Sequence, residues 1–158
     1  MANFNWVKLV LSVLFTVGIG SLGGIFTISE IPGWYAGLQK PSFNPPNWLF
    51  GPVWSMLYLL MGISFYLIWK QPVSTVRNVG LTLFVIQFIL NFFWSIIFFN
   101  QHLIAAAFLE MVFMWIFILL TIIWFAKLSP TAAWLLVPYL CWVSFATVLT
   151  AAIWKLNP

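Results

Sequence analysis

The sequence predicts an all-α integral membrane protein, in which residues 1–158 form a single domain of five transmembrane helices with a long structured loop between the first two. Hydrophobic residues make up 64% of the chain and charged residues only 5%, whereas about a quarter of a soluble domain is charged. The apolar residues fall into runs of about 20, the length at which a helix crosses the roughly 30 Å hydrocarbon layer. The predicted spans are residues 7–27, 48–69, 77–99, 103–125 and 131–154.

None of these runs alternates apolar and polar residues, which argues against a membrane β-barrel. The first run, 7–27, contains Lys8 followed by an apolar stretch that ends in glycines, as a signal peptide would. Its length is that of a spanning helix, so we expect a true first transmembrane helix at this position.

The loop at residues 28–47, which we call the lid, is predicted to be stiff and to cover something. It overlaps the aromatic and proline-rich segment from Trp34 to Trp54, which reads WYAGLQKPSFNPPNWLFGPVW. Proline fixes φ and removes a backbone donor, so this segment is expected to be rigid although no regular structure is predicted for it. Its prolines are Pro41, Pro45, Pro46 and Pro52.

The three later connections are short, so neighbouring helices should run antiparallel. These connections are residues 70–76, 100–102 and 126–130. The last helix has a clear start signal, because Ser129 can cap it and Pro130 fits the first helical position, where a backbone N–H is not needed. Within this helix Pro138 predicts a kink, which can open a gap between helices.

The basic residues indicate orientation rather than a charged partner. A net charge of +4 without a basic cluster does not fit nucleic acid binding. In a five-span topology the two sides of the membrane receive unequal numbers of basic residues, which predicts a cytoplasmic N-terminus and an external lid. Lys8, Lys70, Arg77 and Lys127 fall on one side, and Lys40 and Lys155 on the other.

A stripe of polar and aromatic residues marks the third span as part of a candidate site. Gln87, Asn91, Trp94 and Phe98 share one helical face, and amides are unfavourable against lipid. Similar stripes are Trp54, Tyr58, Met61 and Phe65 on the second span and Trp142, Ala146 and Leu149 on the fifth. If the stripes converge, they enclose an aromatic cavity suited to a flat hydrophobic ligand. Alternatively, the amides only form hydrogen bonds between helices, each worth about 0.6 to 2 kcal/mol, and the aromatic side chains only pack against neighbouring helices.

Small residues line one face of the first helix at four-residue spacing, the pattern that lets helix backbones approach closely. They are Ser12, Thr16, Gly20 and Gly24. The pattern fits a contact within the bundle and a contact across a dimer equally well.

Chemical groups for catalysis are scarce. One histidine, one cysteine and two acids provide neither metal-ligand spacing nor a nucleophile with a base, so no metal and no required cofactor are expected. Glu110, the only acid within a span, either contacts a ligand or is protonated and hydrogen-bonded to a neighbouring helix. His102 could ligate haem, but a lone loop histidine is expected to be solvated, and Cys141 is expected to be a small buried hydrophobe.

Four motifs resemble those of the translocator protein, or tryptophan-rich sensory protein, family. They are WYxxLxKPSFNPP at residues 34–46, GPVW at 51–54, LNFxWS at 90–95 and PYxxWxxFAT at 138–147. The resemblance covers essentially the whole chain. It implies a five-helix protein, commonly a homodimer, that binds porphyrins such as protoporphyrin IX, sterols in mitochondrial members, and synthetic benzodiazepine or isoquinoline carboxamide ligands. A bacterial cell membrane is the expected location.

By position, the resemblance implies a set of ligand contacts that coincides with the stripes described above. This set is Tyr35, Trp54, Tyr58, Gln87, Asn91, Trp94, Trp142 and Ala146. Ala146 matches a position at which threonine variants in the family alter ligand binding. Ala151 stands where the proposed sterol motif of animal members needs a tyrosine, so sterol binding through that motif is not expected.

The residues and the resemblance together leave three functions open. The first is a receptor or sensor for a tetrapyrrole, with Lys40 available to a ligand propionate. The second is oxidative or light-driven porphyrin degradation supported by Trp54 and Trp142, in which the chemistry would belong to the porphyrin. The third is transport with Pro138 and Glu110 as moving or proton-linked parts, although the paired broken helices of secondary transporters are missing.

Overall fold

The computed structural model describes residues 4–158, and over that range the chain is helical and contains no strand. Five of its helices are long and apolar enough to cross a membrane, so this is a multi-pass membrane protein. The elements in chain order are α1 (Trp6–Glu30), α2 (Trp34–Gly37), the 3-10 turn η1 (Asn47–Leu49), α3 (Phe50–Trp69), α4 (Thr75–Ser95), the π-helical turn η2 (Ile96–Asn100), α5 (Ile104–Ala126), α6 (Pro130–Leu135) and α7 (Val137–Leu156).

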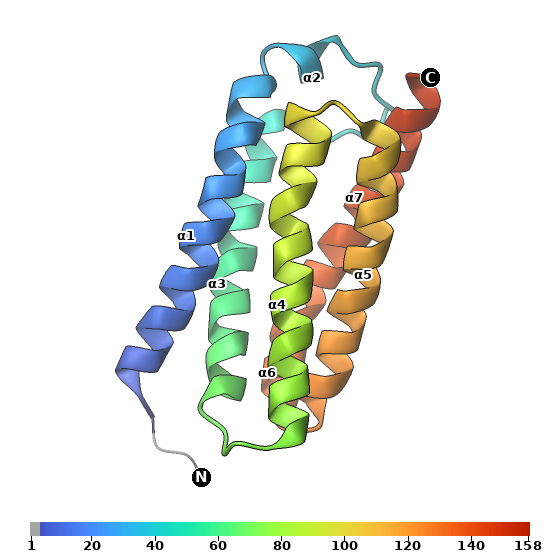
Figure 1. Cartoon of the computed structure of the whole chain (residues 1–158). Coiled ribbons are helices and arrows are strands. Elements are labelled where there is room, and N and C mark those ends of the chain that lie inside the picture. The colour runs from blue at the N-terminus through green and yellow to red at the C-terminus, as the bar shows by residue number, and fades with distance from the viewer. Residues whose placement is uncertain (1–3) are drawn as a thin grey trace.

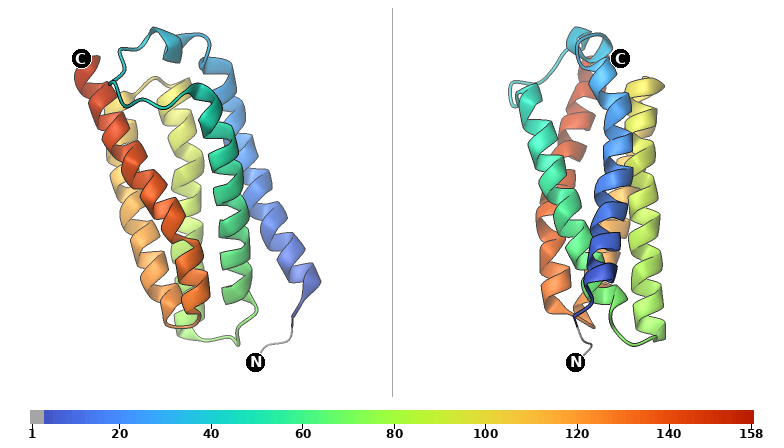
Figure 2. Two further views of the ribbon diagram at one scale, coloured as in Figure 1. Left: turned by 180° about the vertical axis from the view of Figure 1, so that it is seen from behind. Right: turned by 90° about the vertical axis from the view of Figure 1, so that its left-hand side faces the viewer.

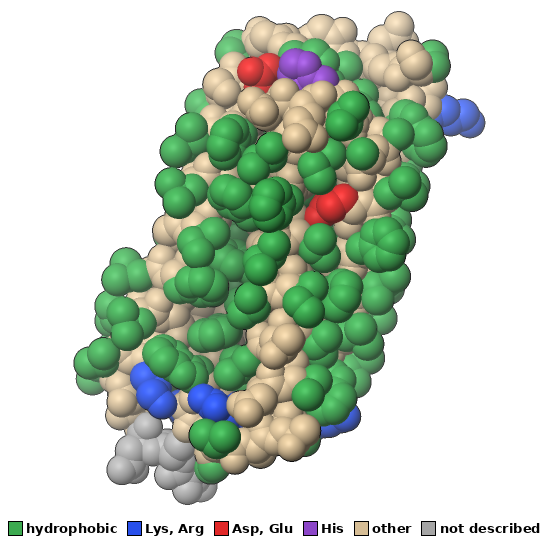
Figure 3. Space-filling model, in the orientation of Figure 1, with side chains coloured by type: hydrophobic (Ala, Val, Ile, Leu, Met, Phe, Trp, Pro, Cys, Tyr) green, Lys and Arg blue, Asp and Glu red, His purple; other side chains and the backbone are tan. Residues whose placement is uncertain are grey.

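The long helices run side by side, and α2 lies across one end of the bundle (Figure 1). The C-terminus is at this lid end, and the N-terminal helix begins at the opposite end. On the face drawn in Figure 3 hydrophobic side chains cover the middle of the molecule, whereas the visible Lys and Arg side chains lie toward its two ends. This distribution is the one expected of a protein whose middle is surrounded by lipid.

The lid contains more regular structure than the sequence predicts. Helix α1 continues to Glu30, three residues into the predicted loop. Residues 34–37 form the short helix α2, so the expectation of a segment without regular structure is wrong there. Position 38 is leucine and not proline, so its N–H is present and donates to the carbonyl of Tyr35 at 3.4 Å.

The last span starts as predicted and is interrupted near its proline. The Ser129 side chain accepts the N–H of Ala132 at 3.2 Å, and Pro130 is the first helical residue. The helix breaks at Leu136, which separates α6 from α7. Pro138 has no N–H to donate to the carbonyl of Trp134 four residues earlier, and this loss explains the break.

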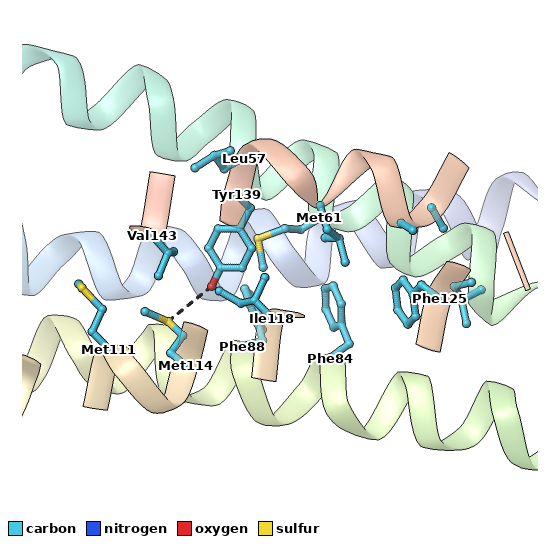
Figure 4. Packing of buried hydrophobic residues seen from close by; sticks show 14 residues of the cluster. Leu57, Met61, Phe84, Phe88, Met111, Met114, Ile118, Phe125, Tyr139 and Val143 are labelled. Carbon is cyan, nitrogen blue, oxygen red and sulfur yellow. Dashed lines mark hydrogen bonds between the residues drawn. The ribbon is translucent and has the colours of Figure 1, made fainter. Parts of the chain in front are cut away.

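A packed core joins α3, α4, α5 and α7 in the part of the bundle away from the lid (Figure 4). The rings of Phe84 on α4 and Phe125 on α5 stack with planes 4° apart and centroids 6.0 Å apart. Tyr139 of α7 is fully buried, and its hydroxyl lies 3.5 Å from the sulfur of Met114 on α5. A second, smaller buried cluster continues at the lid end around Phe98 and Leu149.

Small residues let α1 lie directly against α3, so this part of the small-residue stripe makes a contact within the bundle. The Thr16 hydroxyl donates to the carbonyl of Tyr58 at 2.8 Å. A Cβ added to Gly62 would lie 2.6 Å from the Thr16 hydroxyl oxygen, and one added to Gly20 would lie 2.5 Å from the Tyr58 ring. Gly24, at the end of the stripe, has no such neighbour within 4 Å.

Cys141 lies on the outer surface of α7, so the expectation that it is buried is wrong. Tyr139 and Val143 face the core. A residue two positions from each of them points to the opposite side of a helix with 3.6 residues per turn. Cys141 therefore faces outward.

Candidate ligand-binding site

A cavity of about 430 Å³ lies beneath the lid, between α1, α3, α4 and α7. Its size falls within the roughly 300 to 1,000 Å³ typical of small-molecule sites. Helix α1 contributes Gly20, Ser21, Gly24, Thr27 and Ile28 to the wall. The lid, η1 and α3 contribute Ile31, Tyr35, Asn47, Trp48, Phe50, Gly51, Trp54, Ser55 and Tyr58. Helix α4 and η2 contribute Asn91, Trp94, Ser95, Phe98 and Phe99, and α7 contributes Trp142, Ala146, Leu149, Thr150 and Ile153.

All but one of the predicted ligand contacts lie in this wall. They are Tyr35, Trp54, Tyr58, Asn91, Trp94, Trp142 and Ala146. The three stripes expected from the sequence therefore converge at the lid end of the bundle. Farther from the lid the α3 stripe leaves the cavity, because Met61 belongs to the core and Phe65 packs on Phe84.

Gln87 is the exception. It lies one turn from Asn91 on the side away from the lid, is 1% exposed and is not part of the cavity wall. Neither polar atom of its amide has a hydrogen-bond partner within residues 4–158. Its role as a ligand contact stays a prediction, and reaching the cavity would require the amide to move toward Asn91.

The end of the cavity nearest the core is built by a hydrogen-bonded pair and a stacked aromatic pair. The Tyr58 hydroxyl donates to the Asn91 side-chain oxygen at 3.0 Å. Trp54, one turn away on α3, stacks on Tyr58 with centroids 5.4 Å apart and planes 26° apart. Tyr139 meets the Trp54 ring edge-on from α7 at 6.1 Å. These contacts fix the aromatic faces that a flat ligand would meet.

Two indole groups of the wall have unpaired donors. The Nε1 atoms of Trp94 and Trp142 are buried and have no acceptor in the part of the chain that the structure describes. An indole N–H can only donate, and leaving such a group unpaired in an apolar surrounding costs about 1 to 3 kcal/mol. Each ring is held by an aromatic neighbour, Trp94 by Phe98 at 5.3 Å and Trp142 by Phe50 at 5.9 Å. A ligand with suitably placed acceptors would pair each donor whose indole turns its N–H toward the cavity.

The lid closes the end of the cavity through Tyr35. This side chain is 4% exposed, and its hydroxyl donates to the Asn44 side chain at 2.9 Å within the lid. Burial raises the pKa of the Tyr35 phenol, which therefore stays a neutral donor at neutral pH. Asn157 ties the lid to the end of α7, because its side chain accepts the N–H of Gln39 at 3.0 Å and donates to the Gln39 carbonyl at 2.9 Å.

Comparison with known proteins assigns the chain to a family. The profile of the TspO/MBR family matches residues 12–155. The chain belongs to the TspO/MBR family. It is similar to the tryptophan-rich protein TspO of Chlorobaculum tepidum, with 44% identity over 99% of each chain. The human translocator protein is 39% identical over 86% of this chain and 82% of its own. The tryptophan-rich sensory protein of Cereibacter sphaeroides is 32% identical over 98% of this chain and 94% of its own.

In this member of the TspO/MBR family Lys40 serves the lid and is not part of the cavity wall. Its ammonium group donates to the carbonyls of Ala36 and Leu38 at 3.3 and 3.1 Å. It also lies 4.7 Å from the centroid of the Tyr35 ring, within the range of a cation–π contact. Lys40 would have to leave these partners to reach a ligand propionate.

His102 is exposed, as expected from the sequence, but it also makes contacts that sequence reasoning missed. Its ring stacks on Trp34 of α2 with centroids 4.2 Å apart and planes 13° apart. Its Nε2 lies 3.3 Å from a carboxylate oxygen of Glu30 at the end of α1. The φ of His102 is 58°, a left-handed conformation that non-glycine residues rarely adopt. No periodic pattern links these three positions, so the sequence offered no signal for the contact.

Glu110 lies apart from the cavity, and the expectation of a hydrogen bond to a neighbouring helix is wrong. Both of its carboxyl oxygens are buried and lack a hydrogen-bond partner among residues 4–158, and the residue is not part of the wall. Within the same residues no group of three His, Cys, Asp or Glu side chains lies close enough together to hold a metal ion. The groups available to a ligand in this site are therefore aromatic rings, amides, hydroxyls and indole N–H donors.

Proposed function

We propose that this TspO/MBR family member is a membrane receptor or sensor that binds porphyrins, such as protoporphyrin IX, and similar flat hydrophobic molecules in the cavity beneath the lid. The observation that carries this proposal is the pair of buried, unpaired indole donors of Trp94 and Trp142 in an aromatic wall. Aromatic faces favour a flat π-system. The unpaired donors favour a ligand that carries hydrogen-bond acceptors, such as the propionate or carbonyl oxygens of a tetrapyrrole.

The names of related proteins fit this proposal at a coarser level. The relative from Cereibacter sphaeroides is named a tryptophan-rich sensory protein, and the human relative a translocator protein. A receptor linked to tetrapyrrole or stress regulation, working as a homodimer in a bacterial cell membrane, is the biological setting that we infer. The basic residues at the end opposite the lid favour a cytoplasmic N-terminus.

Porphyrin degradation is the second candidate. Trp54 and Trp142 both line the cavity, so each could contact a bound porphyrin. The residues of the wall provide no acid–base pair, and the reactive chemistry would come from the porphyrin as a photosensitiser with dioxygen as the oxidant. Transport is the third candidate, and the break of the last span at Leu136 is the element that could move.

A single series of measurements separates these functions. Purified protein is titrated with protoporphyrin IX in the dark, and the bound complex is then illuminated and scanned for new absorbing products. A receptor gives saturable binding without a product, whereas an enzyme gives a product that is lost in the Trp54→Phe/Trp142→Phe variant. If the protein is a transporter, porphyrin crosses the membrane of sealed vesicles faster when they contain the protein than when they do not. The absence of saturable binding would contradict the proposed receptor.

A further inference from the structure

We propose that flat hydrophobic ligands reach the cavity sideways from the lipid bilayer, through a window between α1 and α3, without opening of the lid. This inference rests on the proposed function and deepens it. It restricts the ligands to molecules that dissolve in the membrane, and it assigns the lid the task of sealing the site from water.

The window is defined by residues that line the cavity and also reach the outer surface. Ser21 on α1 and Gly51 and Ser55 on α3 are exposed members of the cavity wall. Ile28 and Trp48 frame the same opening nearer the lid and are 72% and 70% exposed. Between α1 and α3 the cavity wall is therefore at most one residue thick, and we infer that the window lies here.

Helices α1 and α3 separate toward the lid, where the close contacts between them end. Thr16, Gly20 and Gly62 hold α1 and α3 together in the part farther from the lid. Nearer the lid, a Cβ placed on Gly24 or Gly51 would meet nothing within 4 Å. Figure 2 (right) shows α1 and α3 close together at the end opposite the lid and apart at the lid end, with α7 behind the gap. At the Cβ positions of Gly24 and Gly51, therefore, no other side chain fills the space.

The surroundings of the window are apolar. Gly24 lies six residues before the end of α1 at Glu30, about 9 Å along the helix axis, so the opening is within the spanning segment. Leu22 and Ile25 next to it are 53% and 61% exposed. Exposed aliphatic side chains in a spanning helix face acyl chains. A molecule dissolved in the outer part of the bilayer would therefore meet the window directly.

Around Tyr35 the lid is closed. Tyr35 is 4% exposed, and the route past it is closed by its hydrogen bond to Asn44 and by the two bonds that join Gln39 to Asn157. A ligand arriving from water would have to break these bonds. A ligand arriving through the window breaks none of them.

A cysteine reporter inside the cavity tests the route without any porphyrin. The Cys141→Ser background removes the one native thiol, and Ala146→Cys places a thiol in the cavity wall. The protein in liposomes is treated with pyrene maleimide, which partitions into lipid, or with a sulfonated maleimide, which stays in water. The window is plugged by Gly51→Leu with Ser55→Phe, or from the other side by Ser21→Phe. Met56→Phe, an exposed α3 position outside the wall, is the matched control.

We expect pyrene maleimide to label the reporter, both plugs to slow that labelling at least tenfold, and Met56→Phe to leave it unchanged. Loosening the lid with Asn157→Ala should not raise the rate at which pyrene maleimide labels the reporter. A plug that unfolds the protein is recognised because the sulfonated reagent then labels the thiol. Unlabelled reporter in the unplugged protein, equal rates with and without the plugs, or faster labelling by the sulfonated reagent would each overturn the proposal. A failed porphyrin titration contradicts only the proposed function.

Discussion

The Tyr58 hydroxyl donates a 3.0 Å hydrogen bond to the Asn91 side-chain oxygen, joining α3 to α4 where the cavity meets the core. The same tyrosine receives the Trp54 ring on one side, and its backbone carbonyl accepts the Thr16 hydroxyl. Tyr58 thus positions α1, the aromatic wall and the amide of the site together. Changes at this residue should affect both stability and binding geometry.

Tyr58→Phe should lower the stability of the bundle by about 0.6 to 2 kcal/mol, the range for hydrogen bonds between membrane helices. For a chain of this size that corresponds to a fall in Tm of about 2 to 6 °C. Thermal unfolding in detergent measures this fall in Tm. Tyr66→Phe is the matched control, because its hydroxyl accepts only the N–H of Asn5 at the end of the bundle. Equal shifts in the two variants would contradict this role of Tyr58.

Gly62→Ala should separate α1 from α3. The added Cβ would lie 2.6 Å from the Thr16 hydroxyl oxygen and 2.8 Å from the Cα of Val13, and overpacking of this kind costs about 1 to 3 kcal/mol. Gly18→Ala is the control, since that Cβ meets nothing within 4 Å; it should be neutral or stabilise α1 by up to about 1 kcal/mol. If Gly62→Ala were as stable as Gly18→Ala, the close packing of the two helices would be refuted.

Asn157→Ala should loosen the lid by removing both bonds to Gln39. Asn157→Asp keeps an acceptor for the Gln39 N–H but loses the donor, so its effect should lie between those of the wild type and the alanine variant. Hydrogen exchange of the Gln39 amide reports the change, and we expect it to be at least tenfold faster in Asn157→Ala. Unchanged exchange in the alanine variant would show that other contacts hold the lid.

Substitutions of His102 should separate its stacking from its backbone strain. His102→Gly loses the ring that stacks on Trp34 but accepts a φ of 58° without strain. His102→Ala loses the same ring and keeps the strained backbone, at a further cost of about 1 kcal/mol. Thermal unfolding should therefore rank the wild type first, then glycine, then alanine. An alanine variant as stable as the glycine variant would contradict the strain at this position.

The features that sequence predicted best have a period or a local signal. Five apolar runs of spanning length predicted the five long helices, because only a helix satisfies the backbone within lipid. The spacing of Asn91 and Trp94 placed both on one helix face, and both line the cavity. Ser129 and Pro130 predicted the start of the last helix through local hydrogen bonding alone.

The features that sequence did not predict depend on contacts between distant segments. Gln87 shares its helix face with Asn91, yet only Asn91 reaches the cavity, because periodicity gives a direction and not the depth at which a cavity ends. The stacking of His102 on Trp34 joins two connections that are far apart in the chain. The burial of Cys141 was expected from its residue type alone, because an amphipathic pattern that could have placed it on the outer face is weak in a helix that is apolar on all sides.

The most direct test of the account is a dark titration of the Trp142→Phe variant with protoporphyrin IX, followed by porphyrin absorbance beside the wild type and Trp134→Phe. Trp134 is the control because its ring is 72% exposed and is not part of the cavity wall. Loss of one hydrogen bond of about 1 to 1.5 kcal/mol predicts a dissociation constant roughly five- to tenfold higher for Trp142→Phe and an unchanged constant for Trp134→Phe. Equal affinities of the two variants, or no saturable binding by the wild type, would contradict binding in this cavity.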